Sequence, residues 1–117
     1  MSVLGISDRR YLEDFLGMSS GYVLNFSDRT FGDFVFEKSG LDIHSPRYTA
    51  DGTSKAKKLR IFFKLESDYI VGTLILALVE HRLSYGEGHS GETTALAEKC
   101  RQIATRLLAG GPNLLHP

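Results

Sequence analysis

The segment from Tyr69 to Val79 is almost wholly apolar, and it constrains the fold of this chain more than any other feature. Its length and composition suit an α-helix. A helix without a polar face must be enclosed by other helices. We therefore expect this helix to have no face for a ligand. The run is too short to cross a bilayer, which takes about 20 apolar residues. We therefore expect an all-α compact bundle of about five helices around this central helix, and no membrane partner.

The composition fits a single compact domain. The chain has 117 residues, of which 42% are hydrophobic and 24% charged, and its formal net charge is zero. A chain of this size can bury a core without disulfides or metals. The single cysteine, Cys100, excludes an internal disulfide and is typical of a reducing compartment, so we expect a cytoplasmic protein.

Capping signals place the helices along the chain. A serine or threonine before a helix accepts a hydrogen bond from a first-turn amide, and glycine ends many helices. Apolar residues before and after a cap form a hydrophobic staple, which we expect for Ile6 with Tyr11 and for Phe26 with Phe31. The five predicted helices begin after Ser7, after Ser27, after Thr53 or Ser54, after Ser67 and near Glu92, and they end at Gly17, Gly40, Glu66, Leu83 and Gly110.

Other segments are less regular. Residues 22–26 and 61–63 could pass as short strands, but helix caps on both sides favour the all-α prediction. We expect a polar connection over residues 41–53 and a flexible one over 84–91. The second contains Gly86-Glu87-Gly88-His89-Ser90-Gly91, a G-x-G-x-x-G pattern, but a phosphate loop of this type would follow a strand, not a helix. The predicted domain covers residues 1–111, and 112–117 are interpreted as a tail or the start of a linker.

No arrangement of side chains predicts a catalytic or metal site. The four histidines lack zinc-protease spacing, and neighbouring acids such as Glu13 and Asp14 point about 100° apart on a helix. Cys100 lies on an apolar stripe and is expected in the core. His81 ends the central helix, where a positive charge interacts well with the helix dipole. We expect no enzyme activity, no cofactor, no metal and no small-molecule substrate.

Basic residues are concentrated in one part of the chain. Residues 45–66 carry six bases and two acids, whereas residues 1–44 carry four bases and seven acids. On the third predicted helix, Lys57, Arg60 and Lys64 form one outer stripe. This stripe is a solvated helix face, a docking surface for an acidic patch, or a phosphate-binding surface. The candidate binding residues are Arg47, Lys55, Lys57, Lys58, Arg60 and Lys64.

One part of the sequence resembles a known family. The chain is similar to the N-terminal domain of bacterial abortive-infection proteins, the AbiJ-like group. The similarity lies in the segments YVLNFSDRTF at 22–31, GLDI at 40–43 and SKAKKLR at 54–60, and in Tyr48 and Gly52. The resemblance implies a small helical module of a cytoplasmic anti-phage defence protein that precedes a separate C-terminal region. It brings no catalytic residues to this chain.

Two functions follow as expectations. The first is a non-enzymatic interaction module (adaptor, sensing or oligomerisation) that binds another protein or a second copy of itself. The alternative is a nucleic-acid-binding module that uses the basic face of the helix from Ser54 to Glu66.

Overall fold

The computed structural model describes residues 3–85 and 90–110, and the regular structure of these residues is helical, without a strand. The all-α prediction is confirmed, and residues 22–26 and 61–63 are not strands. Most of the glycine pattern at 86–91, the predicted boundary at 111 and the segment 112–117 lie outside the described residues. The elements are α1 (Ile6–Leu16), η1 (Met18–Ser20), α2 (Asp28–Ser39), η2 (Pro46–Tyr48), α3 (Lys55–Leu65), α4 (Asp68–Ser84) and α5 (Gly91–Leu108).

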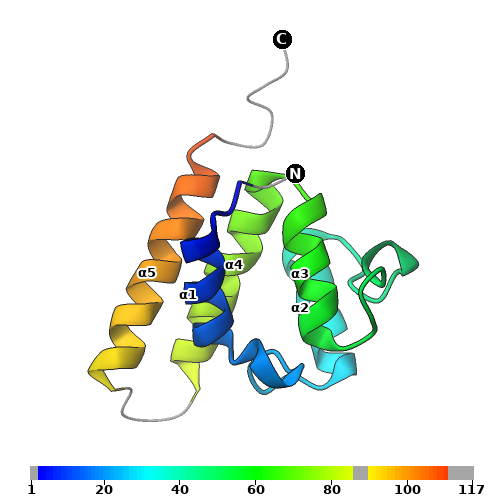
Figure 1. Ribbon diagram of the computed structural model, residues 1–117, viewed down its shortest axis with the longest axis horizontal. Helices are drawn as coiled ribbons and strands as arrows, with labels where there is room; N and C mark the ends of the chain where they lie inside the picture. Colours follow the sequence, from blue (N-terminus) through cyan, green and yellow to red (C-terminus); the bar gives the residue numbers. More distant parts are fainter. Residues whose placement is uncertain (1–2, 86–89, 111–117) are drawn as a thin grey trace.

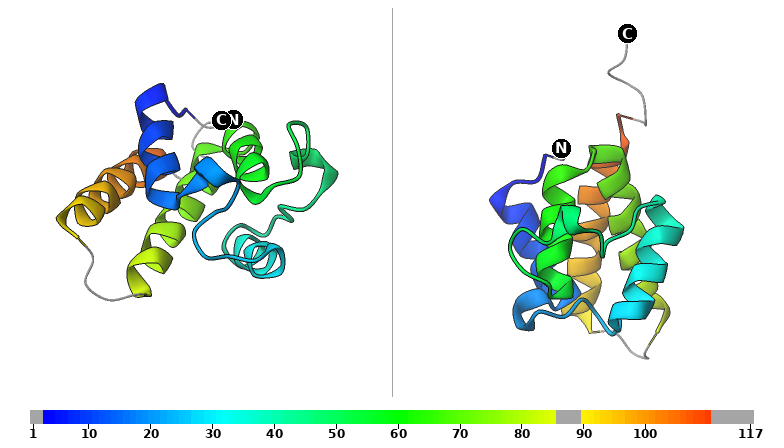
Figure 2. Two further views of the ribbon diagram at one scale, coloured as in Figure 1. Left: turned by 60° about the horizontal axis from the view of Figure 1, so that its bottom comes forward. Right: turned by 90° about the vertical axis from the view of Figure 1, so that its right-hand side faces the viewer.

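The helix α4 occupies the middle of the bundle. It packs along α5 and against α2, and α1 packs on α5 (Figure 1). The right-hand view of Figure 2 shows α1 and α2 on opposite sides of the molecule, with α3 between them in projection. Among the described residues, no helix is both long enough and apolar enough to span a membrane.

Serine caps begin four helices in the described part of the chain, three of them at serines that the sequence predicted. The side chains of Ser27, Ser54 and Ser67 each accept a hydrogen bond from the amide three residues later in the sequence, at 3.1, 3.2 and 3.3 Å. The rings of Phe26 and Phe31 lie 5.6 Å apart, which confirms that staple. These starts were predictable because each involves only neighbours in sequence.

The start of α1 differs from the prediction. The helix begins at Ile6, and the Asp8 carboxylate accepts a hydrogen bond from the Gly5 amide at 2.9 Å. Ser7 is therefore inside the helix, and Ile6 is 78% exposed, so the predicted staple with Tyr11 is wrong. The reason is tertiary: Asp8 is held by Arg106 of α5 at 2.8 Å, which ties the first turn of α1 to the end of α5.

The enclosure of α4 is incomplete. Its residues Val71, Leu74 and Leu78 are fully buried, but Tyr69 remains 38% exposed and Leu76 is only half-buried. The neighbouring helices α2 and α5 leave a strip of α4 uncovered between them. The expectation that α4 has no face for a ligand is therefore wrong.

The connection between α2 and α3 contributes to the core. Its Ile43 is fully buried and Tyr48 nearly so. The Tyr48 hydroxyl donates a hydrogen bond to Glu66 Oε2 at 2.6 Å, which attaches the connection to the end of α3. The segment 41–53, predicted as a polar connection, is thus held both by the burial of Ile43 in the core and by the hydrogen bond from Tyr48 to Glu66.

Candidate functional site

Four of the six candidate basic residues are engaged within the domain. Arg47 Nε donates to Glu66 Oε2 at 2.9 Å. Lys55 Nζ lies 3.6 Å from an Asp28 carboxylate oxygen and 5.0 Å from the centre of the Tyr22 ring. These cations therefore form ion pairs that join α3 to η2 and to the start of α2.

Lys58 is also committed to an internal contact. Its side chain is packed so that only 9% of the residue is exposed, and Nζ lies 2.8 Å from His44 Nδ1. The other ring nitrogen, Nε2, lies 2.7 Å from the Asp28 carbonyl oxygen. Because a carbonyl only accepts, we assign the proton of the neutral ring to Nε2, and Nδ1 then accepts from Lys58.

Arg60 forms the best-aligned ion pair of the set. Its Nε and Nη2 donate to the two carboxylate oxygens of Glu13, both at 2.7 Å, and Nη2 also reaches the Met18 carbonyl oxygen at 3.3 Å. Pairing with Glu13 raises the pKa of the Arg60 guanidinium above its usual value. Two bases of the basic part, Lys55 and Arg60, thus pair with acids of the N-terminal part, Asp28 and Glu13.

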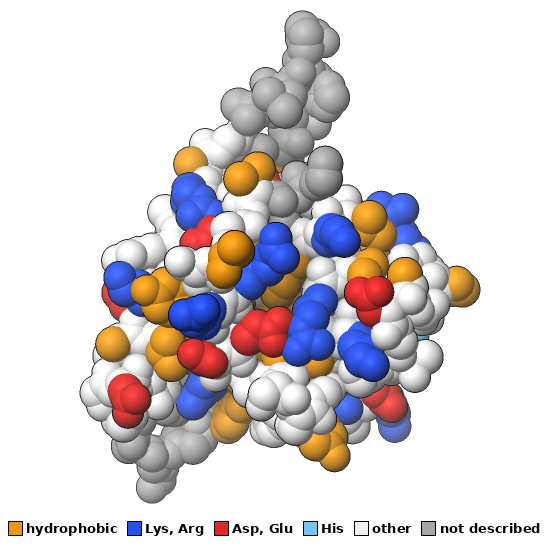
Figure 3. Space-filling model, viewed as in Figure 1, with side chains coloured by type: hydrophobic (Ala, Val, Ile, Leu, Met, Phe, Trp, Pro, Cys, Tyr) orange, Lys and Arg blue, Asp and Glu red, His pale blue; other side chains and the backbone are white. Residues whose placement is uncertain are grey.

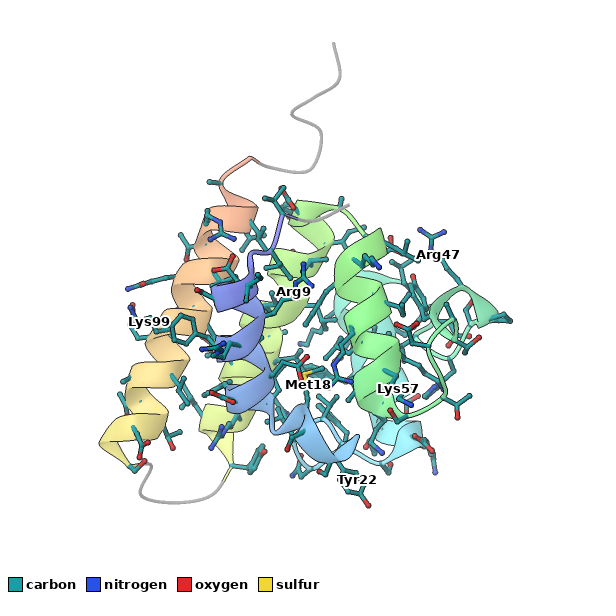
Figure 4. All side chains as sticks on the ribbon, in the orientation of Figure 1. Arg9, Met18, Tyr22, Arg47, Lys57 and Lys99 are labelled. Carbon is teal, nitrogen blue, oxygen red and sulfur yellow. The ribbon has the colours of Figure 1, made fainter. Side chains whose placement is uncertain are left out.

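Lys57 and Lys64 differ from the other four. Both are exposed, and within the described part of the chain neither side chain forms a hydrogen bond or an ion pair. Figure 4 shows Lys57 on the side of α3 away from α1. The Lys57 side chain lies over the backbone turn at Gly52, where an added β-carbon would stand 2.7 Å from Lys57 Cδ.

Lys64 and Arg60 line a cleft between α1 and α3 together with Arg9, a residue that the sequence did not single out. The cleft has a volume of about 440 Å³. Figure 4 shows the Arg9 and Met18 side chains in the space between the two helices, and Figure 3 shows apolar atoms there among charged groups. The apolar lining consists of Leu4, Leu12, Met18, Ile61 and Phe63, and the charged lining of Arg9, Glu13, Asp51, Arg60 and Lys64.

A second concave surface follows the uncovered strip of α4. We call it the α4 groove. It has a volume of about 690 Å³ and shares no residue with the cleft between α1 and α3. Helix α2 borders it with Phe34 and Lys38, and α5 contributes Leu108. The residues of α4 in the groove are Tyr69, Thr73, Leu76, Ala77, Glu80, His81 and Ser84.

His81 stands at one end of this groove in an aromatic cluster. Its ring stacks on Phe26 with centroids 4.7 Å apart, and it meets Phe34 and Tyr85 at 5.2 and 5.3 Å. Burial lowers the pKa of His81 below its usual value of 6.5. The expectation of a favourable cation at this helix end is therefore wrong, because desolvation among aromatic rings disfavours the charged form.

The single cysteine behaves as the sequence predicted. Cys100 is fully buried, and its Sγ lies 3.6 Å from the Tyr11 carbonyl oxygen. Burial raises the pKa of this thiol to about 12. The residue is therefore a packing element of α5, since the thiolate is the reactive form of cysteine.

The described residues contain no group of three histidines, cysteines or acids arranged to hold a metal ion. Comparisons with protein-family models, curated proteins and solved structures gave no match to the chain.

Proposed function

We propose that this chain is a non-enzymatic interaction module of a cytoplasmic bacterial anti-phage defence protein, and that it binds a helix of a partner protein in the α4 groove. The α4 groove carries the proposal. The sequence resemblance to abortive-infection proteins supports the cellular setting, and the geometry of the groove supports the mode of binding.

The groove is open, and its length along α4 suits an amphipathic helix. It runs along α4 from Tyr69 to Ser84, about 22 Å at 1.5 Å per residue. Tyr69, Thr73, Leu76 and Ala77 follow one another at helical spacing, so they present one continuous strip. An uncovered apolar strip of this kind marks interaction sites, and a partner helix would bury it with its own apolar face.

Charged side chains border the groove on both sides. Lys38 of α2 lies 5.6 Å from the centre of the Phe34 ring, and its side chain is 40% exposed. On the side of α5, Glu80 pairs with Arg101 at 3.6 Å. An acidic residue at the edge of the bound helix would complement Lys38 and set the orientation of the helix.

A partner protein explains the groove better than a second copy does. To fill the groove, a second copy would have to insert a row of large apolar side chains from one helix. Among the described residues, the exposed large apolar side chains other than Tyr69 are scattered over separate elements. They are Val3, Ile6, Tyr22, Phe36 and Leu65.

Site-directed photocrosslinking in bacterial cells tests the proposal. A photoreactive residue at position 73 should capture a protein through a segment with helical apolar spacing. A synthetic peptide of that segment should then bind the purified chain, and Leu76→Asp should weaken the binding at least tenfold. Phe36→Asp is the matched control, because it adds the same charge at an apolar side chain of α2 that does not line the groove.

Three results would contradict this proposal. One is equal peptide binding by Leu76→Asp and Phe36→Asp. Another is a crosslink from position 73 to a second copy, with dimers in sedimentation that Leu76→Asp dissolves. The third is a crosslinked segment without helical spacing.

The alternative, a nucleic-acid-binding module, has weaker support. Phosphates would compete with Glu66, Asp28 and Glu13 for Arg47, Lys55 and Arg60. Of the predicted set, Lys57 and Lys64 remain exposed for such contacts. A gel shift with DNA or RNA at low salt that disappears in the Lys57→Ala, Lys64→Ala double variant would favour this alternative.

A further inference from the structure

We propose that the cleft between α1 and α3 is a separate binding site for a small amphipathic carboxylate, a molecule with an apolar body and one negative charge. This inference does not depend on the α4 groove, because the two surfaces share no residue. It rests on the shape, the apolar lining and the balance of charge of the cleft.

The size and floor of the cleft suit an apolar body. Its volume of about 440 Å³ falls within the range of small-molecule sites, about 300–1,000 Å³. Leu12 and Met18 are almost fully buried, and Ile61 and Phe63 nearly so. The half-buried Leu4 and the 7% of Ile61 and of Phe63 that remains exposed offer the apolar surface, and none of these side chains can form hydrogen bonds to the polar edge of a nucleobase. The floor therefore favours an aliphatic or aromatic group over a nucleotide.

The charged lining indicates a single negative charge on the ligand. Three cations, Arg9, Arg60 and Lys64, face two carboxylates, Glu13 and Asp51. Arg60 and Glu13 already satisfy one another through two 2.7 Å hydrogen bonds. Arg9 and Lys64 then remain against the exposed Asp51, which leaves one net positive charge for the ligand.

Arg9 is the residue best placed to bind the anionic group. Its one side-chain hydrogen bond within the described residues is a long contact of 3.4 Å from Nη2 to the Leu4 carbonyl oxygen. A guanidinium offers parallel donors that match the two oxygens of a carboxylate. Lys64, one turn beyond Arg60 on α3, adds a second positive charge to the lining of the cleft.

The test uses the purified chain labelled with nitrogen-15 and titrated with decanoate in NMR. We expect amide shifts at cleft residues such as Leu12, Ile61 and Phe63, with a saturable dependence on concentration. The uncharged analogue 1-decanol should bind at least several-fold more weakly. Arg9→Gln and Lys64→Gln should each weaken decanoate binding about three- to tenfold, as expected for the loss of a charge-assisted contact.

The matched control is Lys57→Gln. It removes the same charge from the same helix, but Lys57 does not line the cleft. Its affinity for decanoate should equal that of the unchanged chain, and circular dichroism should show that all three variants are folded. Leu4→Trp tests the floor, because a larger side chain there should occlude the cleft and reduce binding further.

Several outcomes would overturn the inference. They are shifts outside the cleft, equal affinity for decanoate and 1-decanol, or equal losses in Lys57→Gln and Arg9→Gln. The Leu76→Asp variant separates the two proposals: it should weaken binding of the partner helix at least tenfold and leave decanoate binding unchanged. A failure of binding at one site therefore leaves the proposal for the other site intact.

Discussion

Gly72 of α4 lies so close to Ala104 of α5 that a β-carbon on Gly72 would stand 3.1 Å from the Ala104 carbonyl oxygen. The same β-carbon would stand 3.0 Å from Leu107 Cβ and from Leu108 Cγ. Because a backbone oxygen cannot rotate away, α5 would have to move by a few tenths of an ångström to accept the β-carbon. Glycine at this position therefore permits the close contact between these two helices, the main packing partners in the bundle.

The first prediction concerns this contact. Gly72→Ala should lower the free energy of unfolding by about 1–3 kcal/mol, the usual cost of overpacking. This loss should exceed the gain of up to about 1 kcal/mol that alanine gives over glycine in a helix interior. Urea denaturation followed by circular dichroism measures it. Gly91→Ala is the control: a β-carbon there meets no atom of the described residues within 4 Å, so stability should stay the same or rise slightly. A stabilised Gly72→Ala variant would show that α4 and α5 are less closely packed.

The second prediction concerns the Arg60–Glu13 ion pair. A double-mutant cycle with Arg60→Met and Glu13→Gln should give a coupling free energy of about 1 kcal/mol. This value is at the upper end of the range for partly exposed ion pairs, because the guanidinium donates two well-aligned hydrogen bonds to the carboxylate. The coupling should decrease in high salt. The same cycle on Glu37 and Lys38, whose charged atoms are 3.7 Å apart on the surface of α2, should give a value near zero. Equal couplings for the two pairs would contradict the prediction.

The third prediction follows from the lowered pKa of His81. The unfolded chain binds a proton at this residue near pH 6.5, whereas the folded chain binds it only at lower pH. The stability due to this group is therefore complete above pH 6.5 and decreases as the pH falls through 6.5 toward the folded-state pKa. Thermal melts between pH 7.5 and 5.0 should show this loss, and His81→Phe, which keeps a ring beside Phe26, should reduce it. An identical pH dependence in that variant would refute the assignment.

The fourth prediction concerns Tyr48 and Glu66. Tyr48→Phe removes the 2.6 Å hydrogen bond to a carboxylate whose side chain is only 11% exposed, and it should cost about 1–2 kcal/mol of stability. Tyr22→Phe, at an exposed tyrosine, should have almost no effect. Chemical denaturation of both variants measures the difference, and equal stabilities would contradict the prediction.

The pKa of Tyr48 offers an independent check on the same contact. Burial and Glu66 raise this pKa to about 12. The unfolded tyrosine loses its proton near pH 10, so the stability due to this group is lost as the pH rises from 10 toward 12. Ultraviolet titration of the unchanged chain and of Tyr48→Phe should show by difference that the Tyr48 phenol stays largely protonated at pH 11 in the folded chain. Complete ionisation at pH 11 without unfolding would contradict the buried position of this hydroxyl.

The sequence alone determined the local features of this protein. Ser27 and Gly40 mark the ends of α2 through contacts within four residues: the Thr30 amide donates to Ser27 Oγ, and the Gly40 amide donates to the Phe36 carbonyl oxygen at 2.8 Å. The apolar segment from Tyr69 to Val79 predicted the central helix, because enclosing that segment among other helices removes its apolar surface from water. Such signals depend on neighbours in sequence and need no knowledge of the tertiary structure.

Only the tertiary structure decided which charges and which apolar side chains remain free. Arg60 and Glu13 are 47 residues apart, so helical spacing identified Arg60 as part of a stripe but not its partner on α1. Arg9 had no distinguishing signal until α3 was placed opposite α1. The uncovered strip at Leu76 depends on where α2 and α5 lie around α4. In physical terms, periodicity predicts which residues share a face of a helix, whereas packing between distant segments determines whether that face meets a carboxylate, another helix or water.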